Sequence, residues 1–478
     1  MAPSSPSRVV SKKRFRLAIA MALATTSSHA LSCYLHPRWR RRGNVAVSPR
    51  SEGGGARRKE EVEIVIVGAG VAGLATAASL RRLGVGATVL EQGASLRAGG
   101  TSLTLFKNGW RVLDAIGVAD ELRAKHLRIQ GMKMRSASSP ASAAGGVLRE
   151  FSFEEEAPGQ EVRAVERRAL LEALASRLPP GAISFSSKVR RVAVAGQQQG
   201  PGGATELELE DGRRIVAKVV VGCDGVNSPI ARWMGFSEPR YVGHMAFRGL
   251  ARYDGDGGQP FEAKVNYIYG RGMRAGFVPV SPTRVYWFIC FNRPSPGPKI
   301  TDPAALKREA LELVRGWPED LLAVMRDTPD DNVVRTPLVD RWLWPGLAPS
   351  ASRGGVVLAG DAWHPMTPNL GQGACCALED AVVLARRLAT AAASEGGEAS
   401  SYGEAMRAYE RERWGRVFPL TARAGLVGAL VQWGNPAVCA ARDGVVIPRL
   451  VRLGPFLEHT NFDCGLLEPS AAAAAPSP

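Results

Sequence analysis

The sequence predicts an α/β fold in which a parallel sheet is covered by helices, a second antiparallel sheet is inserted, and helices form the C-terminal region. Three observations predict it. An apolar run at residues 63–68 ends in glycine and leads into a helical pattern, which is typical of a buried parallel strand followed by a helix. Alternating apolar and polar residues between Tyr241 and Asn292 predict antiparallel strands. A long helical pattern begins at Ala374, and further helical segments follow it.

The elements can be placed in chain order. Strands at Glu63–Gly68 and Ala87–Leu90 flank a helix at Val71–Leu83, which makes one βαβ unit. The other expected elements are a helix at Arg163–Leu178, strand-rich segments at Ile183–Val194 and Glu206–Gly222, antiparallel strands at Val265–Tyr269, Gly276–Val280 and Arg284–Phe291, helices at Ala304–Arg315 and Glu319–Met325, a strand at Gly355–Ala359, a helix at Ala374–Thr390, and a flexible linker at Ala391–Ser401.

The overall composition is that of a soluble globular protein. The 478 residues are 45% hydrophobic and 22% charged, enough for two or three domain-sized units. The formal net charge of +16 is concentrated, because residues 1–60 hold thirteen Lys and Arg against two acids, a net +11, which leaves +5 (16 − 11) for the rest. No basic run with interleaved aromatic residues occurs, so no nucleic-acid partner is expected.

The N-terminal segment has the composition of a targeting sequence. Residues 1–60 are rich in Ser, Ala and Arg and contain no acid before Glu52, which predicts a transit peptide for the chloroplast or, as an alternative, the mitochondrion. A secretory signal is a further alternative, because the apolar run Leu17–Ala24 follows basic residues, but the basic composition continues to Arg50. No transmembrane segment is predicted, and peripheral membrane contact stays open.

The cysteines do not form a metal-binding or disulfide pattern. Seven Cys occur without a CxxC or any other metal-ligand spacing, so no metal site is expected and the thiols are expected to be reduced. The adjacent pair Cys375–Cys376 leaves two interpretations open, a redox-active pair or small apolar fillers of a tightly packed helix.

The first chemical motif lies between the first strand and the first helix. Residues 68–73 read Gly-Ala-Gly-Val-Ala-Gly, a GxGxxG pattern whose glycines allow a tight turn and the close approach of a pyrophosphate to helix amides. Glu91 ends the second strand at the distance where a carboxylate accepts hydrogen bonds from ribose hydroxyls. The first motif therefore predicts a Rossmann-like dinucleotide site.

Two further motifs end later strands. Residues 219–228 form a buried strand that ends in Asp224-Gly225, which taken alone is an ordinary turn. In the third motif a strand ends in Gly360-Asp361, and the segment 368–373, Pro-Asn-Leu-Gly-Gln-Gly, opens the long helix. Asp361 can bind a ribityl hydroxyl, and the helix N-terminus would stabilise the negative charge of a reduced flavin by roughly 1 kcal/mol.

In order and spacing these motifs resemble the para-hydroxybenzoate-hydroxylase-like FAD monooxygenases over residues 61–456. The resemblance is closest to plant members related to salicylate-hydroxylase-like enzymes and, more distantly, to zeaxanthin epoxidase. It implies a non-covalently bound FAD, with NADPH or NADH as a transient co-substrate. It also implies that molecular oxygen is activated as a flavin C4a-hydroperoxide and that one oxygen atom is inserted into a small aromatic or isoprenoid-type organic substrate.

The resemblance assigns roles to individual residues. Arg167 matches an arginine that contacts the cofactor, Asp224 and Gly225 match a motif serving both FAD and the reduced nicotinamide, and Asp361 matches the ribityl and pyrophosphate aspartate. The candidate catalytic residues, which line the isoalloxazine, are Pro368, Gly371, Gln372 and Gly373. The full cofactor-binding set expected is Gly68, Ala69, Gly70, Val71, Ala72, Gly73, Glu91, Gln92, Arg111, Arg167, Asp224, Gly225, Gly360, Asp361, Pro368, Gly371, Gln372, Gly373 and Ala374.

The same resemblance implies a division into domains. The expected ranges are residues 1–60 as a transit peptide or disordered segment, 61–135, 161–236 and 330–400 as a discontinuous FAD-binding domain, 136–160 and 237–329 as a substrate-binding sheet domain, 401–465 as a C-terminal helical region, and 466–478 as a disordered tail. Two positions depart from the family pattern. Cys375 stands where most members have Asn, as in the epoxidase-like branch, which leaves alicyclic or polyene substrates open. Ala231 stands where an Arg is frequent, which leaves open one contact to the nicotinamide phosphate.

Several alternatives remain at this level. His364 allows an acid–base role, although a role in ordering its loop is favoured because flavin chemistry needs no side-chain nucleophile. Trp342 and Trp344 are similar to a flavin-halogenase element that lacks its Ile here, or they pack a seam between domains. A flavin-dependent reductase or dehydrogenase, and a flavin-binding protein without turnover, are the alternative functions.

Overall fold

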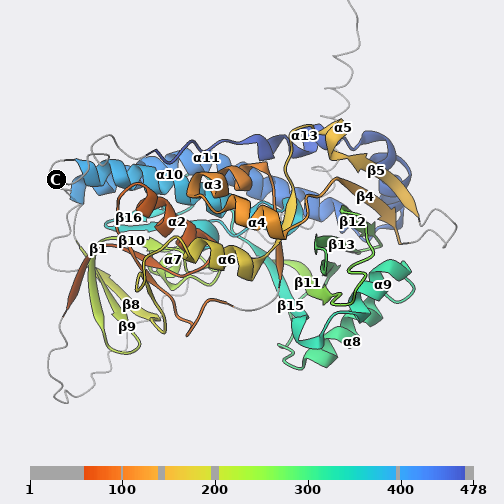
Figure 1. Cartoon of the computed structure of the whole chain (residues 1–478), viewed down its shortest axis with the longest axis horizontal. Coiled ribbons are helices and arrows are strands. Elements are labelled where there is room, and N and C mark those ends of the chain that lie inside the picture. The colour runs from red at the N-terminus through yellow and green to blue at the C-terminus, as the bar shows by residue number, and fades with distance from the viewer. Residues whose placement is uncertain (1–58, 98–100, 138–145, 195–203, 395–398, 469–478) are drawn as a thin grey trace, which may run out of the picture. The chain divides into compact units, whose positions relative to one another are not determined.

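The strand before the glycine-rich turn, β1 (Glu60–Val67), lies in the middle of a mixed sheet whose central strands are parallel (Figure 1). The computed structural model of the chain describes residues 59–97, 101–137, 146–194, 204–394 and 399–468. Within these ranges β1 pairs in parallel with β2 (Thr88–Leu90) and β10 (Arg214–Gly222). The other strands of this eight-stranded sheet are β7 (Ile183–Ser184), β8 (Val189–Val194), β9 (Thr205–Leu209), β16 (Ser352–Arg353) and β17 (Val356–Leu358).

The parallel core of the sheet runs in the order β17–β10–β1–β2–β7. Its central strands are continuous apolar runs, and Ile64–Val67 and Val219–Val221 are buried. Such runs are required where a parallel sheet is covered on both faces. The expected βαβ unit and the strand before residue 360 are therefore confirmed.

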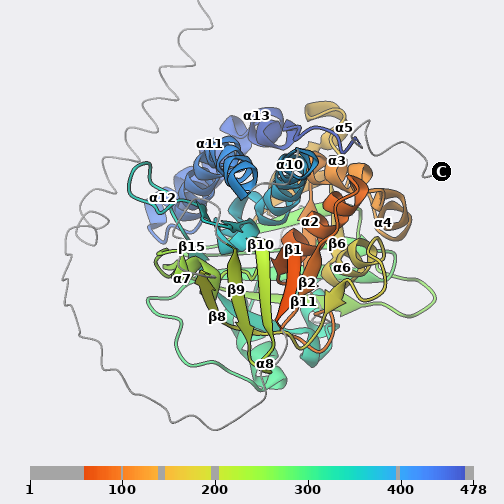
Figure 2. The same ribbon diagram turned by 90° about the vertical axis from the view of Figure 1, so that its left-hand side faces the viewer.

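Long helices pack together above this sheet. The helix α10 (Gly373–Ala393) contacts both α2 (Val71–Arg82) and α11 (Ala399–Val431), as Figure 2 shows. Nearly every residue from Cys375 to Ala385 is buried, so α10 lies inside the protein rather than on its surface. The remaining α-helices are α3 (Lys107–Ile116), α4 (Ala119–Lys125), α5 (Phe153–Glu156), α6 (Arg167–Ala175), α7 (Pro229–Trp233), α8 (Pro303–Leu313), α9 (Glu319–Arg326), α12 (Pro436–Ala441) and α13 (Leu453–Leu457).

A second, seven-stranded sheet is built mostly from the central part of the chain. In the described residues its order is β15 (Val334–Asp340), β11 (Arg240–Arg252), β14 (Arg284–Asn292), β13 (Met273–Ser281), β12 (Lys264–Tyr269), β4 (Gly131–Ser136) and β5 (Val147–Ser152). Side chains alternate between its two faces. One face, with Phe247, Phe277 and Trp287, packs into one apolar cluster with residues of α8 and α9, whereas Tyr267, Tyr286 and Phe288 lie outside that cluster.

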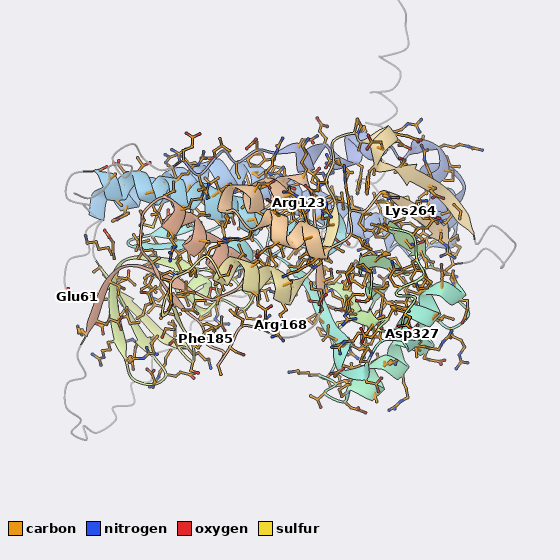
Figure 3. All side chains as sticks on the ribbon, in the orientation of Figure 1. Glu61, Arg123, Arg168, Phe185, Lys264 and Asp327 are labelled. Atoms are coloured by element: carbon orange, nitrogen blue, oxygen red, sulfur yellow. The ribbon has the colours of Figure 1, made fainter. Side chains whose placement is uncertain are left out.

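Short elements complete the part of the chain that the structure describes. They are β3 (Ser102–Leu105), β6 (Arg163–Glu166), the 3-10 helices η2 (Asp330–Asn332), η3 (Gly360–Ala362), η4 (Pro368–Leu370) and η6 (Glu458–Asn461), and the π-helix η5 (Arg442–Leu450). Arg123 of α4, labelled in Figure 3, donates to Asp114 (2.6 Å) and Glu161 (3.0 Å) and so ties α3 and α4 to the segment before β6.

None of the helices in the described part of the chain combines the length and hydropathy needed to cross a bilayer.

Several elements differ from the sequence expectation. The expected helix Arg163–Leu178 begins only at Arg167, because residues 163–166 pair with β3 as a strand. The expected linker is shorter, since α10 continues to Ala393 and α11 begins at Ala399, while residues 395–398 lie outside the described ranges. The second sheet is not purely antiparallel, because β12 pairs in parallel with β4. Moreover, β4 and β15 join this sheet from within ranges assigned to the first domain; the domain boundaries themselves stay a prediction.

We expect Gly249→Val in β11 to destabilise the fold. A Cβ at Gly249 would lie 2.5 Å from the Trp287 ring, which is buried and held by its donation to Thr328 Oγ1 (2.7 Å). Overpacking of this kind costs about 1–3 kcal/mol. The free energy of unfolding in urea should fall by that amount, whereas Gly255→Val, at an exposed glycine with no atom near its Cβ, should change it little. Equal stabilities would contradict the packing.

Candidate functional site

The three motifs follow strands that end side by side. Val67 of β1 lies in register with Leu90 of β2 and with Gly222 of β10, and Gly222 lies in register with Leu358 of β17. The segments that leave these strands therefore start at one edge of the sheet. The carboxyl edge of a parallel sheet, outside the strand ends, is where open α/β proteins bind ligands.

The glycine-rich turn is shaped by close backbone contacts. Gly68 has φ +107°, and a Cβ there would lie 2.5 Å from Cys223 O. A Cβ at Gly73 would collide with Gly68 O, so this glycine lets the helix α2 approach the turn. No atom lies within 4 Å of a Cβ placed on Gly70, which is the N-cap of α2 and has no side-chain cap. Its open side leaves room for an anion near the amides of Val71, Ala72 and Gly73.

Glu91 is fixed at the end of β2. Its Oε2 accepts from Ala69 N (2.8 Å) and its Oε1 accepts from Gly93 N (2.8 Å). A carboxylate has about four acceptor positions, so two remain for hydroxyl donors such as those of a ribose. The neighbouring Gln92 is exposed. The sequence predicted that Glu91 follows the second strand, and the structure confirms this position. Only the structure shows that Glu91 also orders the glycine-rich turn.

Asp361 and Arg167 meet where the third motif leaves its strand. The Asp361 side chain is exposed to solvent, yet the protein around it desolvates the carboxylate and raises its pKa, which the nearby His364 and Arg167 oppose. Burial in turn lowers the pKa of Arg167, and its Nε has no hydrogen-bond partner among the described residues. A Cβ on Gly373 would lie 4.0 Å from Asp361 Oδ1. A desolvated but accessible acid beside an incompletely bonded arginine fits a phosphate- and hydroxyl-bearing ligand.

Asp224 also has an unused acceptor. Its Oδ2 accepts from Ile230 N at 3.4 Å, while Oδ1, although buried, has no partner in the described ranges. Burial raises the pKa of the Asp224 carboxyl. Gly225 follows with φ +83° and open space at its Cβ. A buried acceptor without a donor is costly unless a ligand supplies one, so Asp224 fits a ligand-binding role.

The segment before α10 presents a helix N-terminus. Pro368 is exposed in η4, and Gly371 adopts φ +64°, where a Cβ would lie 2.9 Å from the Phe106 ring. The N-cap Gln372 provides no side-chain cap for the 21-residue helix that begins at Gly373. The first amides of α10, including that of Ala374, have no intrahelical acceptor, so they and the helix dipole favour negative charge at this point.

Arg111 is placed differently from the other expected residues. It lies in α3, and its NH1 donates to Asn461 O (2.8 Å) and Phe462 O (3.3 Å) near the C-terminus. These bonds give Arg111 a structural partner, and a contact of this side chain with the cofactor stays a prediction. The remaining expected residues lie in the segments that leave the strand ends or in the turns that face them.

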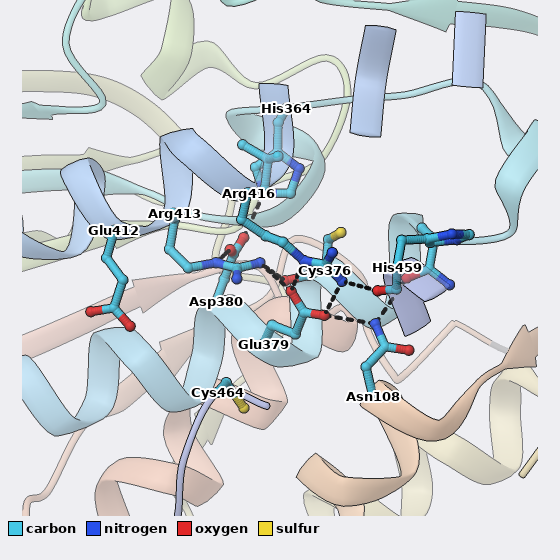
Figure 4. Close-up of polar contacts among 12 residues, drawn as sticks. Asn108, His364, Cys376, Glu379, Asp380, Glu412, Arg413, Arg416, His459 and Cys464 are labelled. Carbon is cyan, nitrogen blue, oxygen red and sulfur yellow. Dashed lines mark hydrogen bonds and ion pairs between the residues drawn. The ribbon is translucent and has the colours of Figure 1, made fainter. Parts of the chain in front are cut away.

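A buried ionic network below the motifs was not expected from the sequence. Asp380 of α10 accepts from Gly360 N (2.8 Å), from Arg413 Nε (2.7 Å), and forms a 2.6 Å contact with His364 Nε2 (Figure 4). All of these side chains are buried. His364 and Arg413 together lower the pKa of Asp380 despite its burial. The network holds the turn at Gly360 and engages His364 in structural contacts, as favoured above.

The neighbouring acid extends the network to the α10 turn. Glu379 accepts from Arg413 NH2 (2.7 Å), Arg416 NH2 (3.0 Å) and Asn108 Nδ2 (2.6 Å). The same Asn108 amide donates to Gln372 Oε1 (2.8 Å), so the network reaches the glycine turn that opens α10. Two adjacent acids within the otherwise apolar stretch 374–385 of α10 are the signal in the sequence that could have revealed this network, since buried acids need partners.

Three half-buried aromatic side chains of the second sheet, Tyr267, Tyr286 and Phe288, form what we call the aromatic face. Their ring centroids lie 5.8 Å (Tyr267–Phe288) and 6.3 Å (Tyr286–Phe288) apart. Phe106 links this face to the Gly371 turn. Phe106, which contacts the Gly371 turn, packs against the same apolar cluster as the two tyrosines. Burial raises the pKa of Tyr286 to about 12, so its hydroxyl keeps its proton at neutral pH.

Two arginines accompany the aromatic face. Arg248 donates to Thr336 Oγ1 (2.6 Å), and its charge acts on both Tyr286 and Arg167. Arg274 is buried; it donates to Asn369 Oδ1 beside the α10 turn, and its Nε has no partner within the described part of the chain. Both arginines donate to neutral oxygens, of Thr336 and Asn369. Their positive charges therefore suit a planar ligand that carries oxygen or acidic substituents.

The structure also bears on the remaining sequence alternatives. Cys375 and Cys376 are buried, and burial raises the pKa of Cys375 to about 12, which favours packing over redox chemistry. The Trp344 ring is tilted against Trp342 (ring centroids 5.2 Å apart) and meets Phe418 of α11 edge to face (5.6 Å). A pocket of about 280 Å³ beside them is lined by Trp344, Trp363, Trp414 and Glu410 among others, and by no motif residue, so it is separate from the site.

We expect Asp380→Asn to destabilise the protein strongly. Removing one charge from a buried pair typically costs about 3–5 kcal/mol. Because partners lower the pKa of Asp380, its stabilisation is complete above the ordinary carboxyl pKa and is lost as pH falls below it. In urea unfolding, the difference from wild type should therefore stay constant between about pH 8 and pH 5 and begin to shrink near pH 4. Asp463→Asn, at an exposed acid 3.6 Å from Arg111, serves as control and should cost little.

Known proteins share this architecture. Residues 61–423 match the family described as FAD binding domain. Monooxygenase 2 of Arabidopsis thaliana is 36% identical over 417 residues, 85% of this chain and 98% of that protein, and Monooxygenase 1 is 31% identical over 85% and 100%. Klebsiella pneumoniae HpxO, solved with FAD and uric acid, has the same fold, with a TM-score of 0.69, 23% identity and coverage of 84% of this chain and 96% of that one. The chain therefore belongs to the para-hydroxybenzoate-hydroxylase-like FAD-dependent monooxygenases, as its three motifs predicted.

Proposed function

We propose that this FAD-dependent monooxygenase uses NADPH or NADH and molecular oxygen to insert one oxygen atom into a small aromatic or isoprenoid-type organic substrate. The observation that carries the proposal is the aromatic face. Phe106 links this face to the Gly371 turn, and Arg248 and Arg274 beside the face supply positive charge. When bound, the flavin supplies the oxygen-activating chemistry. The protein's part is to hold the cofactor, exclude water and orient the substrate.

The residues fit different parts of the cofactor. The open side of Gly70 and the α2 amides suit the pyrophosphate, and Glu91 suits the adenosine ribose. Asp361 and Arg167 suit the ribityl and pyrophosphate groups, because one is an accessible acceptor and the other a donor with spare capacity. The α10 N-terminus suits the negative charge of reduced flavin.

Aromatic substrates have support from relatives. The 3-amino-4-hydroxybenzoate 2-monooxygenase of Streptomyces cremeus is 31% identical over 80% of this chain and 91% of that protein, and the aurachin C monooxygenase/isomerase of Stigmatella aurantiaca is 29% identical over 80% and 94%. The first of these names states an aromatic substrate, a hydroxybenzoate. We infer that a planar molecule stacks on Tyr267, Tyr286 and Phe288 of this chain, with an acidic or oxygen-bearing substituent toward Arg274.

Oxygen incorporation is the decisive test of the function. Candidate substrates should be screened by stimulated NADPH or NADH oxidation with oxygen uptake, and each hit repeated under ¹⁸O₂. We expect one labelled oxygen atom in the product. Substrate-dependent NAD(P)H oxidation without label in any product would instead support the reductase alternative.

We expect two motif acids to have separable roles. Asp361→Ala should weaken FAD binding, and Asp224→Ala should weaken both FAD binding and use of the reduced nicotinamide, each by roughly ten- to a hundred-fold, since losing a charged hydrogen-bond partner costs about 1.5–3 kcal/mol. FAD titration measures the first effect, and rapid reduction by NADPH and NADH at saturating FAD measures the second. Asp256→Ala, at an exposed acid, is the control. Wild-type reduction of FAD-saturated Asp224→Ala would exclude the double role.

We expect Arg274→Met to impair the use of acidic aromatic substrates. The variant removes a buried charge from the aromatic face and leaves the motif residues in place. KM for such substrates should rise roughly ten- to a hundred-fold, because a charge-assisted hydrogen bond contributes about 1.5–3 kcal/mol, while FAD content stays at the wild-type level. Arg271→Met, at an exposed arginine three residues earlier, is the matched control. An unchanged KM in Arg274→Met would place the substituent elsewhere.

We also propose import into plastids, with the mitochondrion as the alternative. The support is the acid-poor, Ser- and Arg-rich composition of residues 1–60, which lie almost entirely outside the described ranges. Residues 1–60 fused to a fluorescent reporter should direct it to plastids in plant cells. Entry of the reporter into the secretory pathway would show that Leu17–Ala24 acts as a signal core.

A further inference from the structure

The C-terminal helices carry a concentration of exposed aliphatic side chains. Eleven large hydrophobic side chains are exposed in the described residues, and five of them fall between positions 426 and 450: Leu426, Leu430, Val445, Val446 and Leu450. We call these five residues the C-terminal apolar surface. Single exposed hydrophobic residues are ordinary, whereas a concentration on neighbouring elements marks an interaction site.

The α11 part of this surface points away from the protein. Asn369 Nδ2 donates to Ala424 O (2.8 Å), and a Cβ on Gly428 would collide with the same Asn369 amide, so this face of α11 is turned inward. Leu426 and Leu430 are four residues apart and therefore share one face, and that face is exposed. The helix thus ends with leucines on its solvent side where charged residues are usual.

The π-helical part is anchored beside the end of α11. Arg442, the first residue of η5, is buried and donates from NH1 to Val431 O (3.0 Å) and Gly270 O (3.2 Å). Ile447 is also buried, which fixes one side of η5 and leaves Val445, Val446 and Leu450 exposed. The exposed side chains of η5 therefore belong to an ordered element rather than to a free tail.

The charge of this region favours an anionic partner. Between Arg413 and Leu457 the sequence contains one acid, Asp443. Its carboxylate is engaged by Arg442 Nε (2.7 Å) and Ser136 Oγ (2.9 Å). Arg449 and Arg452, which flank Leu450 and Val451, are exposed. Aliphatic side chains bordered by arginines are the composition of surfaces that lie in the headgroup region of anionic bilayers, whereas a second copy would present the same positive charge.

We propose that the C-terminal apolar surface docks the protein on an anionic lipid bilayer. Val451 and Phe456, which follow this surface in the chain, pack against the cluster that contains Tyr267 and Tyr286. Docking would therefore bring the apolar cluster that contains Tyr267 and Tyr286 close to the lipid. The membrane contact itself does not depend on the proposed oxygenation, and its test measures binding alone.

Vesicle flotation of the full chain tests the proposal. The probes are vesicles of phosphatidylcholine alone and of phosphatidylcholine mixed with phosphatidylglycerol. Residues 1–60 carry a net +11, and we expect this charge to attract anionic vesicles by itself. Each measurement is therefore made at low and at high salt, because high salt screens most of that attraction. We expect wild type to float with the mixed vesicles and to retain binding at high salt, where the inserted leucines and valines contribute.

Two independent double variants disrupt the surface, Leu426→Glu with Leu430→Glu, and Val446→Glu with Leu450→Glu. Each should lower the apparent affinity for mixed vesicles at high salt by about tenfold or more, with FAD content and melting temperature unchanged because all four sites are exposed. The matched control is Leu347→Glu, since Leu347 is 82% exposed and lies outside this surface.

Three outcomes would overturn the proposal. Equal binding of wild type and both double variants would assign the membrane contact to residues 1–60. Loss of wild-type binding at high salt would show that the exposed leucines and valines do not contribute to membrane binding. Concentration-dependent dimers of wild type that the double variants abolish, seen by sedimentation without vesicles, would instead assign the surface to a second copy of the chain.

Discussion

Two adjacent carboxylates buried in α10, Glu379 and Asp380, dictate how the helices and the strand ends are assembled. A buried carboxylate without partners costs several kcal/mol, so both need donors from elsewhere in the chain. Arg413 of α11 bonds to both acids, at 2.7 Å in each case, and is itself fully buried. The pairing fixes α11 against α10, and the attraction of the two acids raises the pKa of Arg413, which keeps it charged.

The free acceptor positions of the same acids organise the site. Asp380 accepts a hydrogen bond from the amide of Gly360, where the third motif leaves its strand. Glu379 accepts one from Asn108, which also donates to Gln372 at the start of α10. One network therefore positions both the acid-bearing turn at 360–361 and the glycine turn at 371–373. In a dry interior each hydrogen bond of such a network is strong and each unpaired charge is costly, so the two acids draw polar residues from four separate segments into an otherwise apolar interior.

The two sheets contribute different chemistry. The parallel sheet places three motifs at one edge, because parallel strands end together and their backbone amides and carboxylates then face one ligand. The second sheet offers an aromatic face with Arg248 and Arg274. Phe106 contacts both the Gly371 turn and the cluster beneath the tyrosines, so it lies at the junction. A cofactor edge on one sheet and a separate aromatic face on the other, which we propose as the substrate face, would let one fold serve many substrates.

The sequence alone determined the fold class and the positions of the three motifs. The glycine-rich turn, the acids at strand ends and the glycine turn before α10 are local patterns, because steric limits on φ and the register of parallel strands act over a few residues. They predicted the α/β fold and the FAD-binding family, and both are confirmed; the individual cofactor contacts stay a prediction.

Tertiary structure decided the rest. Residues 163–166 have no local signal that separates a strand from the start of a helix, and only their pairing with β3 makes them a strand. Likewise, Arg111 donates to backbone at 461–462, and Arg413 reaches Glu379 and Asp380 across more than thirty residues of chain. Such partners are chosen by desolvation and proximity in the folded protein, and no spacing in the sequence encodes which distant group will arrive.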